Sequence, residues 1–192
     1  MLVLLVACAP VAMMPPPTPF AEGQHFEVGG ALTGSAYDTR FSTCGTDFGA
    51  PCSGLGLHGY ALGRIGPVDL GGLVYAGMAE AAGGGVLVRV SPVDTRRFRL
   101  GAQLDGGWIW AALGVPVAVG LSDRVWLYSQ PSAGWRTAGV VRVPLGVSIR
   151  MPYGYVAHFE AGVGTGHVEG RFRDTVQGVT TGWVAVGSGY RW

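Results

Sequence analysis

The sequence predicts an all-β fold, a closed antiparallel up-and-down transmembrane β-barrel of ten strands, with eight strands as the alternative. Three observations predict it. Hydrophobic residues make up 48% of the 192 residues, yet after the N-terminus no apolar run approaches the ~20 residues of a membrane-spanning helix. From His25 onward, apolar and polar residues alternate with period two, as in strands with two unlike faces. The connections after even-numbered segments are all tight, and both long connections follow odd-numbered segments. A closed barrel is the other structure that satisfies its whole backbone in lipid.

Composition narrows the function classes. Only 13% of residues are charged, the chain has 34 Gly, and the net charge is +1. All 13 basic residues are Arg, because the sequence contains no Lys. A disordered chain is excluded, and an ordinary cytosolic enzyme is disfavoured. Without a basic excess, no nucleic acid partner is expected.

The N-terminal residues predict export. Leu5-Val6-Ala7-Cys8 follows a short apolar run and resembles the bacterial lipoprotein box, which implies lipidation of Cys8. The alternative is an ordinary cleaved signal, since Ala7-Cys8-Ala9 also fits a small-x-small site. Pro15-Pro16-Pro17-Thr18-Pro19 favours extended polyproline II. We therefore expect an export signal over 1–8, a Pro-rich tether over 9–24 and a barrel domain over 25–192.

Cys44 and Cys52 lie in a Gly-, Ser- and Thr-rich stretch. In an exported protein, two Cys in one loop predict a disulfide. A metal site would need more ligands than His58, the nearest His, so we expect neither a metal nor a cofactor.

Ten alternating segments are expected. They span residues 25–37, 55–65, 69–81, 85–93, 97–110, 115–121, 125–134, 140–151, 155–165 and 180–192. The connections after the even-numbered segments are tight, and the long ones, 38–54 and 166–179, follow odd-numbered segments. Short turns at one end and longer loops at the other are typical of membrane-spanning barrels. Eight strands would need one strand over 97–121, far longer than the ~9–11 residues required. Pro144 predicts a local irregularity in its strand.

The last segment ends in an aromatic residue preceded by alternating residues on one face: Val184, Val186, Ser188, Tyr190 and Trp192. Ser188 departs from the apolar pattern. With this ending, residues 25–192 resemble the small outer-membrane β-barrel proteins of Gram-negative bacteria. The resemblance implies a location in the bacterial outer membrane, with the lipid bilayer and the barrel insertion machinery as partners. It also implies that Val184, Val186, Tyr190 and Trp192 form the insertion signal. It implies no oligomeric state.

The polar faces predict what fills the barrel. The residues assigned to the lumen are Glu27, Arg64, Arg89, Arg99, Asp105, Arg142, Arg150, Glu160 and Arg191. Buried charges persist only when paired, so we expect an Arg–carboxylate network that plugs the barrel, with any leak favouring anions. Aromatic belts are expected at both membrane interfaces. Phe26, Phe98, Tyr155, Tyr190 and Trp192 would form one, and Tyr37, Trp108, Trp110, Trp135 and Trp183 the other.

Two rival functions share this alternation. A tethered soluble barrel of the lipocalin or avidin type, binding a small apolar ligand, would have the two faces exchanged, with apolar residues inside. An enzyme could use His158 and Glu160, which stand two apart on one face as a base and its orienting group. No Ser nucleophile accompanies them by spacing, so we expect a non-enzymatic outer-membrane barrel, structural or narrow, with outward loops.

Overall fold

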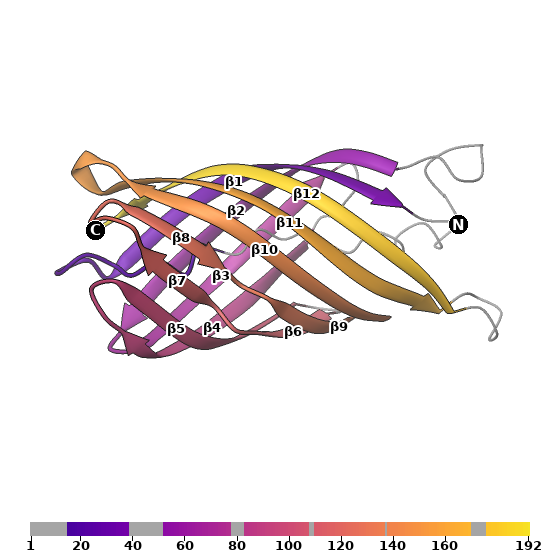
Figure 1. Ribbon diagram of the computed structural model, residues 1–192, viewed down its shortest axis with the longest axis horizontal. Coiled ribbons are helices and arrows are strands. Elements are labelled where there is room, and N and C mark those ends of the chain that lie inside the picture. Colours follow the sequence, from indigo (N-terminus) through magenta and orange to yellow (C-terminus); the bar gives the residue numbers. More distant parts are fainter. Residues whose placement is uncertain (1–14, 39–51, 78–82, 108–109, 137, 170–175) are drawn as a thin grey trace.

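The computed structural model describes residues 15–38, 52–77, 83–107, 110–136, 138–169 and 176–192. In these ranges the chain forms one antiparallel sheet that closes on itself, because the first strand pairs with the last (Figure 1). The strands are β1 (Phe26–Asp38), β2 (Cys52–Ile65), β3 (Val68–Gly77), β4 (Gly83–Asp94), β5 (Phe98–Gly107), β6 (Trp110–Gly114), β7 (Val117–Gly120), β8 (Val125–Ser129), β9 (Ser132–Arg136), β10 (Ala138–Arg150), β11 (Tyr155–Glu169) and β12 (Val176–Arg191). A 3₁₀ turn (Pro152–Gly154) precedes β11.

These segments occupy ten positions around the barrel. Both β6 and β7 pair with β5, one after the other along it, and therefore share one position. Likewise β8 and β9 both pair with β10. The predicted ten-stranded antiparallel barrel is confirmed, and the eight-stranded alternative is excluded.

One predicted strand boundary is wrong. The segment expected over 97–110 ends at Gly107, and Trp110 begins β6, directly paired with Gly107. In an uninterrupted strand, Trp110 would have the same parity as Phe98 and Leu100, which face outward. An apolar residue at position 110 fits the period-two pattern of the preceding strand. The pattern alone therefore does not show that this strand has ended and the next has begun. Trp110 in fact points inward and is buried.

Proline accounts for the divided strands. The break between β6 and β7 contains Pro116, and the break between β8 and β9 contains Pro131. Proline has no N–H to donate to the ladder, and here both carbonyls accept bonds from neighbouring strands, Pro116 from Gly101 and Pro131 from Val115. The irregularity predicted at Pro144 lies in the neighbouring strand instead. β10 itself is continuous, while its partner strand is interrupted after Ser129.

The two ends of the barrel differ as predicted. The connections at 66–67, 95–97, 121–124 and 151–154 lie at the end where β1 begins and β12 stops. We call this the short-turn end. The strand ends that flank 39–51, 78–82, 108–109, 137 and 170–175 lie at the opposite end. Both connections predicted to be long, 38–54 and 166–179, fall there, but each is shorter than predicted, because β2 begins at Cys52, β11 runs to Glu169 and β12 begins at Val176. Gly66, with φ of 59°, supplies the left-handed conformation of the two-residue turn at 66–67.

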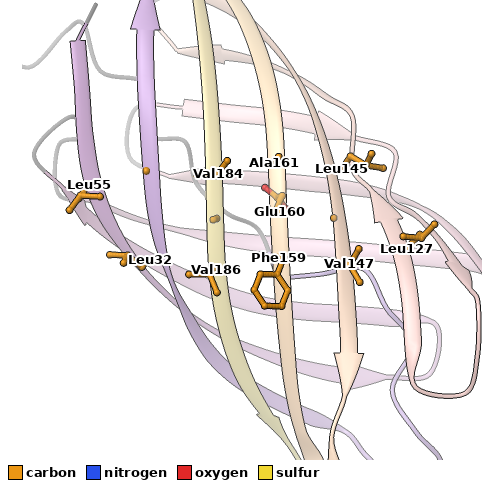
Figure 2. A pocket seen from close by; sticks show the side chains of 13 residues that line it. Leu32, Leu55, Leu127, Leu145, Val147, Phe159, Glu160, Ala161, Val184 and Val186 are labelled. Atoms are coloured by element: carbon orange, nitrogen blue, oxygen red, sulfur yellow. The ribbon is translucent and has the colours of Figure 1, made fainter.

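The barrel is apolar outside and polar inside. On β10, Val143 and Leu145 are 48% and 66% exposed, whereas Gly146 is buried and Ser148 is 1% exposed. Figure 2 shows this outer face, where Leu32, Val186 and Phe159 continue the apolar surface over β1, β12 and β11. No helix in the described ranges is long and apolar enough to span a bilayer. A lipocalin-like barrel would present the reverse arrangement, so that alternative is wrong.

Exposed aromatic residues cluster on the outer face at the short-turn end. Phe26, Tyr155, Tyr190 and Trp192 are exposed and contact one another across β1, β12 and β11. The rings of Phe26 and Trp192 stack with centroids 5.9 Å apart. These are four of the five residues predicted for this belt, and the fifth, Phe98, is exposed at the start of β5. At the other end the prediction is wrong for two members that the structure describes, since Trp110 and Trp183 are buried and point into the lumen.

Candidate functional site: the barrel lumen

The structure places all nine predicted lumen residues on the inward face. Glu27, Arg89, Arg99, Asp105 and Arg191 are at most 2% exposed, and Glu160 is 8% exposed. Arg64, Arg142 and Arg150 are partly buried. The residues lie in two groups, one at the short-turn end and one farther along the barrel. Gln103 bridges the groups, because it accepts from Arg89 Nε at 2.9 Å and donates to Asp105 at 3.1 Å.

Asp69 organises the group at the short-turn end. Its fully buried carboxylate accepts hydrogen bonds from Arg64 Nε at 2.8 Å and from Arg99 Nη2 at 2.7 Å, and Arg89 Nη1 lies 3.6 Å away. Sequence reasoning missed Asp69. Its signal was available, because Arg64 and Asp69 flank the Gly66-Pro67 turn and are therefore a cross-strand pair. Asp94 adds a second carboxylate, near Arg64 and Arg99.

A second ion pair closes the seam between β1 and β12. Arg191 Nε donates to Glu27 Oε2 at 2.8 Å, and the Tyr60 hydroxyl donates to Glu27 Oε1 at 2.7 Å. Arg191 and Glu27 are direct cross-strand partners. The first and last strands are thus joined by a buried, charge-assisted hydrogen bond.

The group farther along the barrel is held less by arginine. Glu160 accepts hydrogen bonds from Tyr128 Oη at 3.3 Å and Trp183 Nε1 at 3.0 Å. Asp105 is bonded to Gln103, and its nearest arginine, Arg142, is 3.9 Å away. Both oxygens of Glu160 are therefore engaged by ring donors.

His158 does not form the base and orienting pair considered from the sequence. It is fully buried, and neither ring nitrogen has a hydrogen-bond partner among the described residues. Its ring packs against Tyr60 with centroids 6.2 Å apart. Glu160 therefore does not orient His158 in this structure.

The feature that sequence reasoning missed most completely is the N-terminal segment. Residues 15–20, expected within an external tether, are buried inside the barrel at the short-turn end. We call them the lumen segment. The Phe20 ring lies between two guanidinium groups, 4.8 Å from Arg64 and 4.9 Å from Arg191, and joins the buried apolar cluster with Tyr60 and Leu62.

Arginine side chains bind the backbone of the lumen segment. Arg89 Nη2 donates to the Pro15 carbonyl at 2.8 Å, and Arg99 Nη1 donates to the Thr18 carbonyl at 3.3 Å. The Pro19 carbonyl accepts from Arg191 Nη1 at 2.9 Å and also from Arg150. Four prolines give this segment many acceptors and few donors. It suits a cavity whose walls carry an excess of donors, which is why it packs there.

Other predicted site residues are placed as follows. Val184, Val186, Tyr190 and Trp192 lie on the outward face. Cys8 and Cys44 fall outside the described residues, and Cys52 begins β2. In the described ranges, no group of three His, Cys, Asp or Glu residues could hold a metal ion.

The chain is similar to several solved structures over most of its length. It is similar to the KdgM porin solved with disordered oligogalacturonate, at 10% identity over 84% of this chain and 98% of that one, with a TM-score of 0.46. It is also similar to the attachment invasion locus protein Ail of Yersinia pestis (11%, 88% and 99%, TM-score 0.36) and to Neisserial surface protein A (15%, 89% and 100%, TM-score 0.36). No family model and no curated protein matches. The case for membrane insertion rests on the chain's own apolar outer surface.

Proposed function

We propose that the chain is an outer-membrane barrel whose lumen is closed by its own side chains and by the lumen segment, and which presents its longer loops outside the cell. The observation that carries this proposal is the reversal of polarity across the wall. Side chains such as Leu145 are exposed on the outer face, while Arg89, Arg99 and Asp69 are buried within. An exposed apolar band around a closed sheet is stable in lipid and unfavourable in water.

Three further elements belong to the proposal. Cys8 is lipidated, which anchors the chain at the membrane surface. Cys44 and Cys52 form a disulfide that restrains the first long loop. The outward-facing C-terminal residues Val184, Val186, Tyr190 and Trp192 are read by the barrel insertion machinery. Each is supported by its sequence pattern.

Site-directed labelling tests membrane insertion. A spin label at Leu145 is expected to be accessible to lipid-soluble quenchers and shielded from aqueous ones in reconstituted vesicles. Ser148, three residues along on the opposite face, is the matched control and is expected to be shielded from lipid. A Leu145 label inaccessible to lipid-phase quenchers, with Ser148 freely open to water, would overturn the proposal.

A further inference from the structure

The arginines that hold the lumen segment outnumber the carboxylates that contact them. Five guanidinium groups surround the segment, those of Arg64, Arg89, Arg99, Arg150 and Arg191. Three carboxylates contact these groups, those of Glu27, Asp69 and Asp94. Five positive charges against three negative ones leave an excess of two. The lumen segment does not reduce this excess, because it contributes neutral carbonyl oxygens.

Several donors in this cluster remain unused. Buried nitrogens of Arg64 (Nη2), Arg89 (Nη1), Arg99 (Nε) and Arg150 (Nε) have no hydrogen-bond acceptor among the described residues. Two of them still lie near a carboxylate, Arg89 Nη1 at 3.6 Å from Asp69 and Arg99 Nε at 3.4 Å from Asp94. A buried donor without an acceptor is costly. The cluster therefore offers more donors and more charge than its present contacts use.

We propose that these five arginines form a binding site for a multivalent oxyanion, a ligand carrying carboxylate, sulfate or phosphate groups, and that the lumen segment occupies this site as an internal competitor. The carbonyl oxygens of Pro15, Pro17, Thr18 and Pro19 stand where the anion's oxygens would lie. Guanidinium groups bind charged oxygens more strongly than neutral ones, and often through two nitrogens at once. An anion therefore satisfies the same donors and also neutralises the excess charge.

Phe20 anchors the C-terminal end of the lumen segment. Phe20 is held by cation–π contacts with Arg64 and Arg191. Next to it, the chain turns through the exposed residues 21–23 before β1 begins. The lumen segment is thus attached to the wall at its C-terminal end and can leave the site without breaking any strand pairing. This inference rests on the proposed closed barrel and adds a ligand class to it.

Calorimetric titration of the full-length barrel in lipid vesicles tests the site, with citrate and tripolyphosphate as carboxylate and phosphate probes and maltotriose as the uncharged control. Replacing residues 15–20 by a Gly-Ser segment of equal length is expected to tighten binding of both anions about tenfold or more, because the competitor is removed. F20A is a milder variant with the same expected direction. In the replaced chain, R89Q and R99Q are each expected to weaken binding about tenfold, whereas R96Q, in an exposed turn, leaves it unchanged.

Heat-modifiable migration on gels establishes that each variant is folded. If the folded, segment-replaced barrel binds neither anion more tightly than the parent chain, or if R89Q and R99Q leave its affinity unchanged, the anion site is overturned. The Leu145 label reports insertion without any anion, so failure of the closed-barrel proposal is read separately. Tightening confined to one probe identifies whether carboxylate or phosphate is preferred, and supports the site.

Discussion

At the residue scale, the lumen shows how a chain without lysine buries charge. Arg64, Arg89 and Arg99 converge on Asp69, and each guanidinium also reaches at least one further group through its planar set of donors. A lysine ammonium carries its three donors on one nitrogen, whereas the planar guanidinium spreads five donors over three nitrogens and reaches acceptors on several sides. Because the three arginines share one carboxylate, Asp69 carries more of the electrostatic balance than any single arginine does.

Asp69→Asn is expected to lower the free energy of unfolding by about 3–5 kcal/mol. The buried Arg89 loses its one carboxylate partner among the described residues, and Arg64 and Arg99 keep only Asp94. Asp123→Asn is the matched control, because Asp123 pairs with Arg96 and Arg97 in an exposed turn. Its expected effect is at most about 1 kcal/mol. Urea titration in lipid vesicles, followed by tryptophan fluorescence, measures both. Equal effects for the two variants would contradict a special role for Asp69.

At the element scale, inward-facing aromatic residues pair with glycines on neighbouring strands. Tyr128 pairs directly with Gly146, Trp183 with Gly162, and Tyr60 with Gly29. In each case the ring lies over the glycine, at the position a Cβ atom would occupy. The inward rings can therefore lie along the wall. This packing brings the hydroxyl of Tyr128 and the indole nitrogen of Trp183 to the two oxygens of Glu160.

Gly162→Ala is expected to destabilise the barrel by about 1–3 kcal/mol, because the new methyl group overlaps the Trp183 ring and displaces its hydrogen bond to Glu160. Gly182→Ala is the control from the neighbouring strand, where nothing lies within 4 Å of the added Cβ atom. Its effect is expected to stay within about 0.5 kcal/mol. The same urea titration compares the two. A tolerated Gly162→Ala would mean that the ring has another position available.

At the scale of the whole molecule, closure of the sheet and filling of the lumen depend on different parts of the chain. Pairing of β1 with β12 removes the sheet edges. A barrel of about eight strands is just filled by its side chains, and ten leave slightly more room. In this chain the lumen segment occupies part of that room, at the short-turn end. The result is a barrel closed along its wall and obstructed along its axis.

The parent chain is therefore expected to form no stable large-conductance openings in planar bilayers. Replacing residues 15–20 by a Gly-Ser segment is expected to produce openings that favour anions, because arginine exceeds carboxylate around the vacated space. Reversal potentials across a KCl gradient measure the selectivity. Stable large openings in the parent chain would contradict the closed lumen. Cation preference in the variant would contradict the excess of arginine over carboxylate around the vacated space.

An epitope tag beside Asp174, in the connection before β12, is expected to be accessible to antibody on intact cells. The longer loops of such barrels face outward, and the short turns face the periplasm. A tag inserted at the Gly66-Pro67 turn is the matched control, expected to be accessible only after lysis. The reverse pattern would invert the orientation.

Local pattern in the sequence determined the class of fold, the strand number, the two faces of most strands and the end that carries the long connections. These features follow from alternation and turn chemistry, which involve residues close together along the chain. Only the tertiary structure decided which partners meet in the lumen. Arg89 meets Pro15, and Arg191 meets Glu27, through strand register and closure. Alternation predicts that a side chain points inward, but it does not predict which residue that side chain meets across the barrel. For the same reason, the Pro-rich segment gave no local sign that its unpaired carbonyl oxygens match the unpaired arginine donors inside.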